Sequence, residues 1–483
     1  MGSILSTLMP EDLCTPNFAR QVKGHIIADK SNIARLNAKI QDLRRLRERE
    51  PAAPRPLIAP IHKLPVELLT EIFLLVLGSR EDWLAQALVV SQVCAHWRRV
   101  ACATPQLWNG EIALNLTKPR SDVYLATTKT LFERSAPLSI SVLLENEPVE
   151  ASPLVDYLYS LAPRWKALTW TQSTSSRLSA LPRGVLNNLE SVFLLDCTDL
   201  PVSSPTDAFL GAQRLRVAAL DLRGLGCFRM PWSQLTLVSL TGDGVPSSPA
   251  QLFLDILVQC TAAVEVHFSR MMPWTEAPTS SAPIIRLPRL ANLELIFGPG
   301  GKNITPFFTR LALPALTYLS IYAAIGTSWS SADFTQFQRR SPNVHELLLC
   351  GPSLTSDRAV SLLTEYPHLT CINLQFVFRR GGPLNLSSVL DWLTYRDTAS
   401  AVNAPRLRRL VIMDPRLNDI EEAVWEEMIF SRWWPDAQLA NHTGARLETL
   451  VLARGRDLLH QFSASFVEKM DQLRTAGLNV MIL

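Results

Sequence analysis

A glycine-rich segment that ends in lysine, residues 298–302 with the sequence GPGGK, is the part of this chain closest to a nucleotide-binding motif. In a phosphate-binding loop, backbone N–H groups near the glycines surround the phosphate, and a Ser or Thr follows the lysine. Here the first glycine does not stand at the position that the phosphate-loop motif requires, and Asn303 follows Lys302 in place of Ser or Thr. We therefore expect this segment to be a turn after a strand that ends at Phe297. The sequence also lacks the G-x-S-x-G, H-E-x-x-H and protein-kinase motifs, and no catalytic residue is predicted.

The eight cysteines are the other residues whose chemistry could define a function. They are scattered, with no C-x-x-C pair and no nearby His pair, which disfavours metal sites and a disulfide framework and fits a reducing compartment. A catalytic cysteine would need a polar, activating environment. Cys94 and Cys371 instead fall on an apolar helix stripe and a strand, where inert thiols are expected. We therefore predict no metal site and no cofactor.

Two short amphipathic helices are predicted between residues 64 and 101. The first has Pro65 at its first position and Glu67 in its first turn, and Ser91 can cap the second. The apolar residues recur at helical spacing: Leu64, Leu68, Leu69, Ile72, Phe73, Val76 and Leu77 in the first helix, then Val93, Trp97 and Val100 in the second. Helices this short cannot bury that much apolar surface by themselves, so the rest of the chain or another protein should cover part of it.

This segment resembles the F-box over residues 61–108. The shared order is L-P-x-E-[LI]-[LI]-x-x-I-F, then V-C-x-x-W-R-x-[VI]-A, then P-x-L-W, which residues 105–108 supply. The resemblance implies a helical domain that docks onto the Skp-family adaptor of cullin-RING ubiquitin ligases. From the resemblance and the apolar stripes, adaptor contacts are expected at Leu64, Pro65, Glu67, Leu68, Ile72, Phe73, Val93, Cys94 and Trp97. An amphipathic helix pair from an unrelated helical domain is the alternative.

Residues 26–50 are predicted to form an amphipathic helix. Apolar residues repeat along it in heptads: Ile26, Ile33 and Ile40, each of the last two followed three residues later by a leucine, Leu36 and Leu43. A short coiled coil that pairs two copies is one interpretation, and a helix that lies on the F-box or is free in solution is the other; the second is favoured because Asp29 and Glu50 fall on the seam. Residues 1–25 are expected to be mobile and 51–60 to be a stiff Pro-rich linker. This order resembles the large F-box families of mushroom-forming fungi.

A motif L-x-x-L-x-L, often preceded by Pro, recurs after Trp108. Its middle positions from Val266 to Ile372 lie 27, 26, 28 and 25 residues apart, which is the spacing of leucine-rich repeats. The second and third apolar residues of each copy alternate as in a strand and should both point into the core. We therefore predict an α/β fold: a short N-terminal helix and a three-helix F-box, followed over residues 109–483 by a leucine-rich-repeat solenoid with a curved parallel sheet. Strands at 111–116 and 138–144 should open the array and 478–482 should close it.

The period breaks twice, because 38 residues separate Ile372 from Leu410 and 40 residues separate Leu410 from Leu450. The longer segments contain residues 379–382 (RRGG) and an acidic-aromatic stretch with Trp425, Trp433 and Trp434. These tryptophans could form a substrate-contacting loop or could pack a lengthened return helix. The second interpretation is favoured because large aromatic side chains usually serve cores.

Residues that flank the buried pair in each strand should line the concave face of the array and bind a protein substrate there. The candidates are Asp221, Arg223, Glu265, His267, Asn292, Glu294, Tyr318, Tyr322, Asn373, Gln375 and Arg409. Their mixture of charge, amide and tyrosine suits a protein better than nucleic acid, which would require a basic stripe. Solvated positions without a role are the alternative, and Leu348, Met413 and Val451 at equivalent places indicate that part of the face is covered.

The 483-residue chain carries a net charge of +3, too small to indicate binding to nucleic acid or an acidic membrane. It shows no signal-peptide pattern and no apolar run of membrane-spanning length, so we expect a cytoplasmic or nuclear protein. The resemblance implies a non-catalytic substrate receptor of a cullin-RING ubiquitin ligase. Its expected partners are the Skp-family adaptor, a cullin through that adaptor, and a protein substrate. An adaptor-binding scaffold without a role in ubiquitination is the alternative.

Overall fold

The chain is described by a computed structural model, in two compact units, Met1–Val76 and Leu77–Leu483. Residues 51–59, most of the predicted linker, and the predicted insertion at 379–382 lie outside the described part. The described residues are 16–49, 60–77, 82–116, 122–146, 153–171, 178, 181–195, 205–242, 249–275, 283–299, 302–324, 327–328, 330–351, 356–376, 386–396, 402–413, 420–436, 444–453 and 462–482.

The described part of the first unit is helical. It contains α1 (Pro16–Arg49), the short 3-10 helix η2 (Pro60–Lys63) and α2 (Val66–Val76). Helix α1 begins at Pro16, well before the predicted start, because a proline at the first helical position needs no N–H partner. Its last described residue is Arg49.

The second unit opens with the helices α3 (Trp83–Gln92) and α4 (Ala95–Cys102) and the 3-10 helix η3 (Pro105–Trp108), which pack together. Trp108 is fully buried and donates its indole N–H to the carbonyl of Ala101 at 2.8 Å. The prediction that Ser91 caps the second helix is wrong. Ser91 is buried inside α3, and the extended Cys94 caps α4 by accepting a hydrogen bond from the backbone N–H of Trp97 at 3.4 Å.

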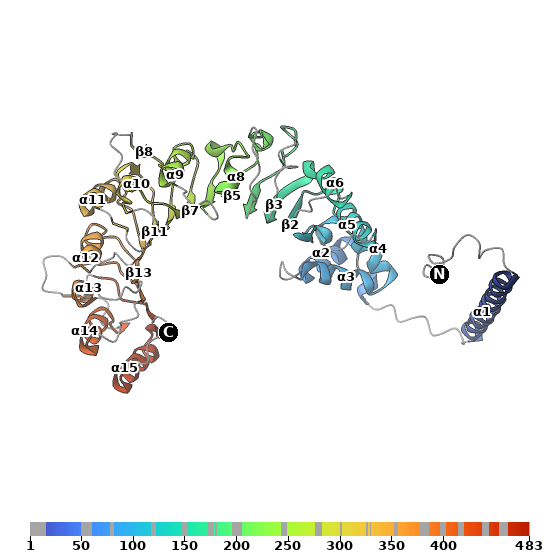
Figure 1. Ribbon diagram of the computed structural model, residues 1–483. Helices are drawn as coiled ribbons and strands as arrows, with labels where there is room; N and C mark the ends of the chain where they lie inside the picture. The colour runs from blue at the N-terminus through green and yellow to red at the C-terminus, as the bar shows by residue number, and fades with distance from the viewer. Residues whose placement is uncertain are drawn as a thin grey trace. The chain divides into compact units, whose positions relative to one another are not determined.

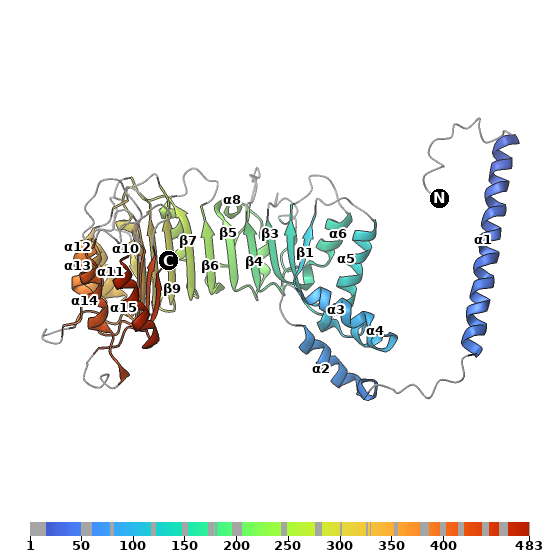
Figure 2. The same cartoon turned by 90° about the horizontal axis from the view of Figure 1, so that it is seen from below.

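A parallel sheet of fourteen strands runs through the rest of the second unit (Figures 1 and 2). The strands pair in chain order, so that each repeat adds one strand beside the last. Their bounds are β1 (Ile112–Asn115), β2 (Ile140–Glu145), β3 (Trp165–Thr171), β4 (Ser191–Leu195), β5 (Val217–Asp221), β6 (Leu237–Thr241), β7 (Glu265–Met271), β9 (Asn292–Phe297), β11 (Tyr318–Ala323), β12 (Glu346–Cys350), β13 (Cys371–Gln375), β14 (Arg409–Met413), β15 (Thr449–Ala453) and β16 (Asn479–Ile482). Two short strands, β8 (Ile285–Arg286) and β10 (Leu311–Ala312), form a separate parallel pair.

Helices return the chain between strands and lie on the outer side of the curved sheet, as Figure 1 shows for the second unit. The α-helices are α5 (Asp122–Arg134), α6 (Pro153–Ser160), α8 (Leu222–Leu225), α9 (Ala250–Leu257), α10 (Thr305–Thr309), α11 (Ser331–Arg340), α12 (Ser356–Thr364), α13 (Leu386–Leu393), α14 (Glu422–Arg432) and α15 (Ala464–Thr475). The 3-10 turns are η4 (Ala162–Arg164), η5 (Ala208–Gly211) and η6 (Trp232–Gln234). Successive helices from α10 to α14 contact each other, which closes the core on its outer side.

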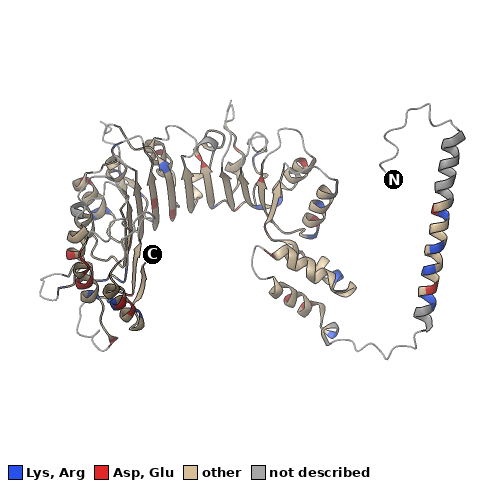
Figure 3. Ribbon diagram, turned by 60° about the horizontal axis from the view of Figure 1, so that its bottom comes forward, with Lys and Arg blue, Asp and Glu red and all other residues tan. Residues whose placement is uncertain are grey.

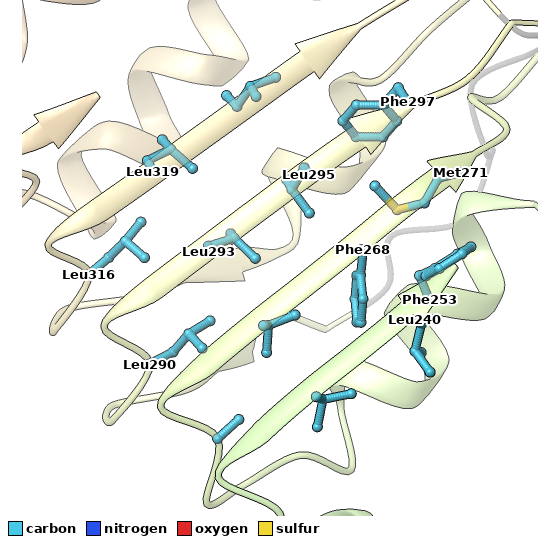
Figure 4. Close-up of a cluster of buried hydrophobic side chains, with 14 of the residues drawn as sticks. Leu240, Phe253, Phe268, Met271, Leu290, Leu293, Leu295, Phe297, Leu316 and Leu319 are labelled. Carbon is cyan, nitrogen blue, oxygen red and sulfur yellow. The ribbon is translucent and has the colours of Figure 1, made fainter. Parts of the chain in front are cut away.

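The core is built from the second and third apolar residues of each repeat (Figure 4). Their register is continuous across strands; one column of fully or almost fully buried residues contains Leu240, Phe268, Leu295, Ile321, Leu349 and Leu374. The leucines that precede the strands, such as Leu290 and Leu316, are also fully buried. The predicted fold class, an α/β solenoid of leucine-rich-repeat type with a parallel sheet, is therefore confirmed.

The tryptophans near the C-terminus serve packing. Trp425 in α14 is fully buried, and Trp434 is 5% exposed, with its ring at 5.0 Å from the ring of Tyr395 in an edge-on contact. Trp433 is half-buried, 6.0 Å from the guanidinium carbon of Arg446. The favoured interpretation, that these side chains pack a lengthened return helix, is confirmed for Trp425 and Trp434.

The end of β12 requires a glycine. A Cβ added at Gly351 would lie 2.6 Å from the backbone oxygen of Ala323, closer than such atoms approach in proteins. We expect Gly351→Ala to lower the free energy of unfolding by about 1–3 kcal/mol through overpacking. Gly226 is the matched control, because it is exposed and an added Cβ there meets no atom within 4 Å. Urea unfolding of both variants checks this, and equal midpoints would contradict it.

Candidate binding surfaces

Helix α2 exposes apolar side chains that a folded chain normally buries. Leu69 and Phe73, one helical turn apart, are fully buried on one side. The other side presents what we call the α2 surface, whose residues are between 36% and 83% exposed: Val66, Leu68, Ile72, Leu75 and Val76. Large apolar side chains gathered on the exposed side of a helix indicate a surface that binds a partner.

Most of the predicted adaptor contacts in the first unit lie at exposed positions. Pro65, Glu67, Leu68 and Ile72 are exposed, and Leu64 is half-buried. Phe73 is fully buried, and its role as an adaptor contact remains a prediction. Sequence reasoning missed Leu75 as a surface residue, although the unbroken apolar run from Ile72 to Leu77 signalled that some of these residues must face solvent.

A second apolar surface lies on the helical opening of the second unit. Leu88, Val89 and Val93 are 39%, 64% and 56% exposed, and we call them the α3 surface. Of the predicted contacts, Val93 is part of this surface, while Cys94 and Trp97 are half-buried and joined by the capping hydrogen bond. Leu88 and Val89 were missed, because α3 was not predicted as a separate helix.

Helix α1 carries an exposed apolar stripe. Ile33, Leu36, Ile40 and Leu43 are between 47% and 58% exposed. Basic residues outnumber acidic ones along the described part of the helix, as Figure 3 shows. Pairing of two parallel copies would place Lys39 of one copy beside Arg44 of the other, at positions that flank the apolar heptad seam. The two positive charges would repel each other and weaken the pairing. Pairing through α1 remains a prediction.

The concave sheet face presents polar residues in rows, because neighbouring strands are in register. The first row, at the starts of the strands, contains Glu265, Asn292, Tyr318, Glu346, Cys371 and Arg409. The second row contains His267, Glu294, Ser320, Leu348, Asn373 and Val411. Tyr322 and Gln375 flank Cys350 in a third row. The register thus brings together nearly all of the predicted substrate-binding residues, although paired positions on neighbouring strands lie 25 or more residues apart in the chain.

Two predicted substrate-binding residues are not exposed residues of a strand. Asp221 ends β5 but is only 2% exposed, because the chain turns directly into α8 behind it. Arg223 lies within α8 and not on a strand. The alternation argument gave the side of the strand correctly but could not locate where the strand ends.

A carboxylate–imidazole–carboxylate arrangement links β7 to β9. The Nε2 atom of His267 lies 2.7 Å from Oε1 of Glu265, and its Nδ1 atom lies 2.9 Å from Oε2 of Glu294. Each ring nitrogen of His267 thus faces one carboxylate oxygen. All three side chains are about one-third exposed, so the arrangement presents acidic oxygen atoms to solvent on the concave face.

A pocket of about 460 Å³ lies beside this arrangement, at the starts of β9, β11 and β12. Its lining residues are Asn292, Thr317, Tyr318, His345 and Glu346. Burial raises the pKa of the Tyr318 hydroxyl, a hydrogen bond with Ser320 opposes the rise, and the negative charges of Glu294 and Glu346 add to it. The hydroxyl is therefore neutral at physiological pH, where it can donate or accept hydrogen bonds.

Three buried or half-buried cysteines have raised pKa values, which disfavours the reactive thiolate form. Burial raises the pKa of the Cys260 thiol to about 12 and that of the Cys350 thiol to about 11. Cys371 on the concave face also has a raised pKa, first through burial and then through the charge of Glu346. Within the described ranges, no cluster of three or more His, Cys, Asp or Glu side chains could hold a metal ion, and no helix is long and apolar enough to cross a membrane.

Comparison with known proteins gives one family match and a distant structural similarity. No curated protein sequence matches the chain. A crystal structure of a TLR13–ssRNA13 complex is similar with a TM-score of 0.43 and 15% identity; the match covers 75% of this chain and 44% of that chain, so this chain spans less than half of that protein. Residues 61–110 match the F-box-like family. These residues, which include the α2 and α3 surfaces, therefore form an F-box-like domain.

Proposed function

We propose that this protein is the substrate-recognition subunit of an SCF-type cullin-RING ubiquitin ligase. The observation that carries the proposal is the F-box-like match at residues 61–110, in a segment whose apolar side chains are exposed. In the F-box family this segment binds a Skp-family adaptor, and through the adaptor a cullin. Exposed Leu, Ile and Val side chains are the contact surface that such an adaptor would bury.

The repeat array would then hold a protein substrate near the ubiquitin-conjugating enzyme of the complex. Such a subunit contributes proximity and performs no bond chemistry of its own. The first and second rows on the concave face support this role, because they present charged, amide and aromatic side chains as one surface. The proposed role places the protein in the cytoplasm, the nucleus or both.

Purification of the tagged full chain with the proteasome inhibited, followed by mass spectrometry, tests this function. We expect a Skp-family adaptor and a cullin to co-purify with the chain, together with one or more ubiquitinated proteins. Recovery of the adaptor without any cullin would favour the second candidate, an adaptor-binding scaffold. Recovery of neither partner would overturn both.

Substrate capture should depend on tyrosines of the concave face. Tyr318 is half-buried at the pocket and Tyr322 is 37% exposed in the third row. We expect Tyr318→Ala with Tyr322→Ala to reduce recovery of the substrate about tenfold or more, because buried aromatic anchors dominate protein interfaces. Quantitative mass spectrometry of the purified complex checks this, with adaptor recovery unchanged as the control. Loss of substrate only in variants of Trp433 would instead place recognition near α14.

A further inference from the structure

The pocket on the concave face is bordered by the carboxylates of Glu346 and Glu294, and the basic side chains closest to Glu346 in the lining and along the first row are His345 and Arg409. Glu346 is exposed at its rim, and no Lys, Arg or His side chain in the described part of the chain pairs with its carboxylate. Glu294 lies close enough to raise the pKa of Tyr318, as Glu346 does. His267 on β7 lies between Glu265 and Glu294 and contacts both carboxylates.

The other lining groups suit a planar cation. Asn292 and Tyr318 begin their strands side by side, and Tyr318 is in register with Glu346 on its other side. An amide oxygen, a phenol ring and a carboxylate therefore occupy consecutive positions of the first row. A guanidinium can form two parallel hydrogen bonds with a carboxylate and stack on an aromatic ring, which an ammonium cannot do equally well.

The backbone carbonyl groups beside the pocket already accept hydrogen bonds from the neighbouring strand, so side chains must recognise the ligand. The carbonyl of Thr317 accepts hydrogen bonds from the N–H groups of His345 and Glu346, at 2.9 and 3.0 Å, and that of Ala291 accepts from those of Thr317 and Tyr318. These carbonyls are occupied by the ladder between strands. The volume of about 460 Å³ lies within the range of ligand pockets, roughly 300–1,000 Å³, and can admit a long side chain.

We propose that this pocket binds an arginine side chain of the protein substrate, with Glu346 as its ion-pair partner and Tyr318 as its stacking surface. The proposal rests on the substrate-receptor function above, since it names the chemistry that the concave face selects. It predicts a substrate segment with an exposed arginine and excludes one whose only charged residues at this position are acidic.

Direct peptide binding to the purified full chain tests the proposal. The probe is the peptide acetyl-(Gly-Ser-Arg)₃-amide, and matched peptides carry lysine, citrulline or glutamate in place of arginine. We expect the arginine peptide to bind most tightly and Glu346→Gln to weaken its binding about tenfold or more. Tyr318→Leu should weaken it as well. Glu468→Gln, at an exposed position of α15, is the matched control and should have no effect.

Three results would overturn the proposal: equal binding of the citrulline or lysine peptide, equal weakening by Glu468→Gln, and unchanged binding by Glu346→Gln. We expect each variant to fold, since Glu346 and Glu468 are both exposed. Circular dichroism checks this. The assay needs neither adaptor nor cullin. Absence of those partners from the purified complex would therefore count against the proposed function alone, and failure of arginine binding would count against this pocket alone.

Discussion

Replacing Leu68 and Ile72 together with aspartate should abolish capture of the Skp-family adaptor while the repeat array stays folded. The two side chains are 52% and 36% exposed, one helical turn apart on the α2 surface. Buried apolar anchors typically contribute about 2 kcal/mol or more each to an interface, so the loss should reach roughly a thousandfold in affinity. Carboxylates at these positions would also have to lose their hydration on binding. Pull-down and a titration with purified adaptor measure the effect.

The matched control carries the same chemical change elsewhere. Val258 and Val467 are 47% and 37% exposed on the helical side of the repeat array, and Val258→Asp with Val467→Asp should leave adaptor binding unchanged. Thermal unfolding followed by circular dichroism verifies that both double variants retain the repeat domain. Undiminished binding of the Leu68 and Ile72 variant would remove the α2 surface from the adaptor contact.

The repeat fold could be predicted because one short motif encodes it many times. Each copy contains a proline or turn, one buried leucine, and two alternating apolar residues, and the stack forms only when consecutive copies cover one another. The strands predicted to open and close the array, at 111–116, 138–144 and 478–482, are present as β1, β2 and β16. The same periodicity gave the side of the sheet on which each strand residue lies.

Local boundaries were less predictable, because they depend on contacts between distant residues. Ser91 is a good capping residue by type, yet α3 extends over it and Cys94 caps the next helix instead. Asp221 and Arg223 follow the outward side of the strand pattern, but β5 ends at Asp221 and the chain turns into α8. Neither outcome follows from residue type and spacing alone.

The exposed residues of the candidate binding surfaces could not be identified from the sequence, for a different reason. Sequence patterns assign residues to an apolar stripe but do not say which part of the stripe is covered. Phe73 and Ile72 are neighbours in one apolar run, yet the first is fully buried and the second is 36% exposed. Similarly, Glu265 and Glu294 were both expected on the concave face, but only the strand register showed that they share His267.

Removal of the Arg432 guanidinium should cause the largest loss of stability of any single polar substitution proposed for this chain. Arg432 is 1% exposed at the end of α14 and donates hydrogen bonds to the carbonyls of Leu393, Asn403 and Ala404. It thus ties α14 to the segments that precede β14, where the repeat is lengthened. Burial lowers the pKa of Arg432 to about 10, so the side chain still carries its charge at neutral pH.

Arg432→Leu keeps an apolar side chain in the space but leaves these carbonyl oxygens without their donor. Each buried unsatisfied group costs about 1–3 kcal/mol, so we expect the free energy of unfolding to fall by about 3 kcal/mol or more. Arg408→Leu is the control, because Arg408 forms an exposed ion pair with Glu448 and such pairs contribute about 0–1 kcal/mol. Urea unfolding measures both variants. Equal midpoints would show that water replaces the guanidinium at these carbonyls and that the buried hydrogen bonds contribute little to the stability of the lengthened repeat.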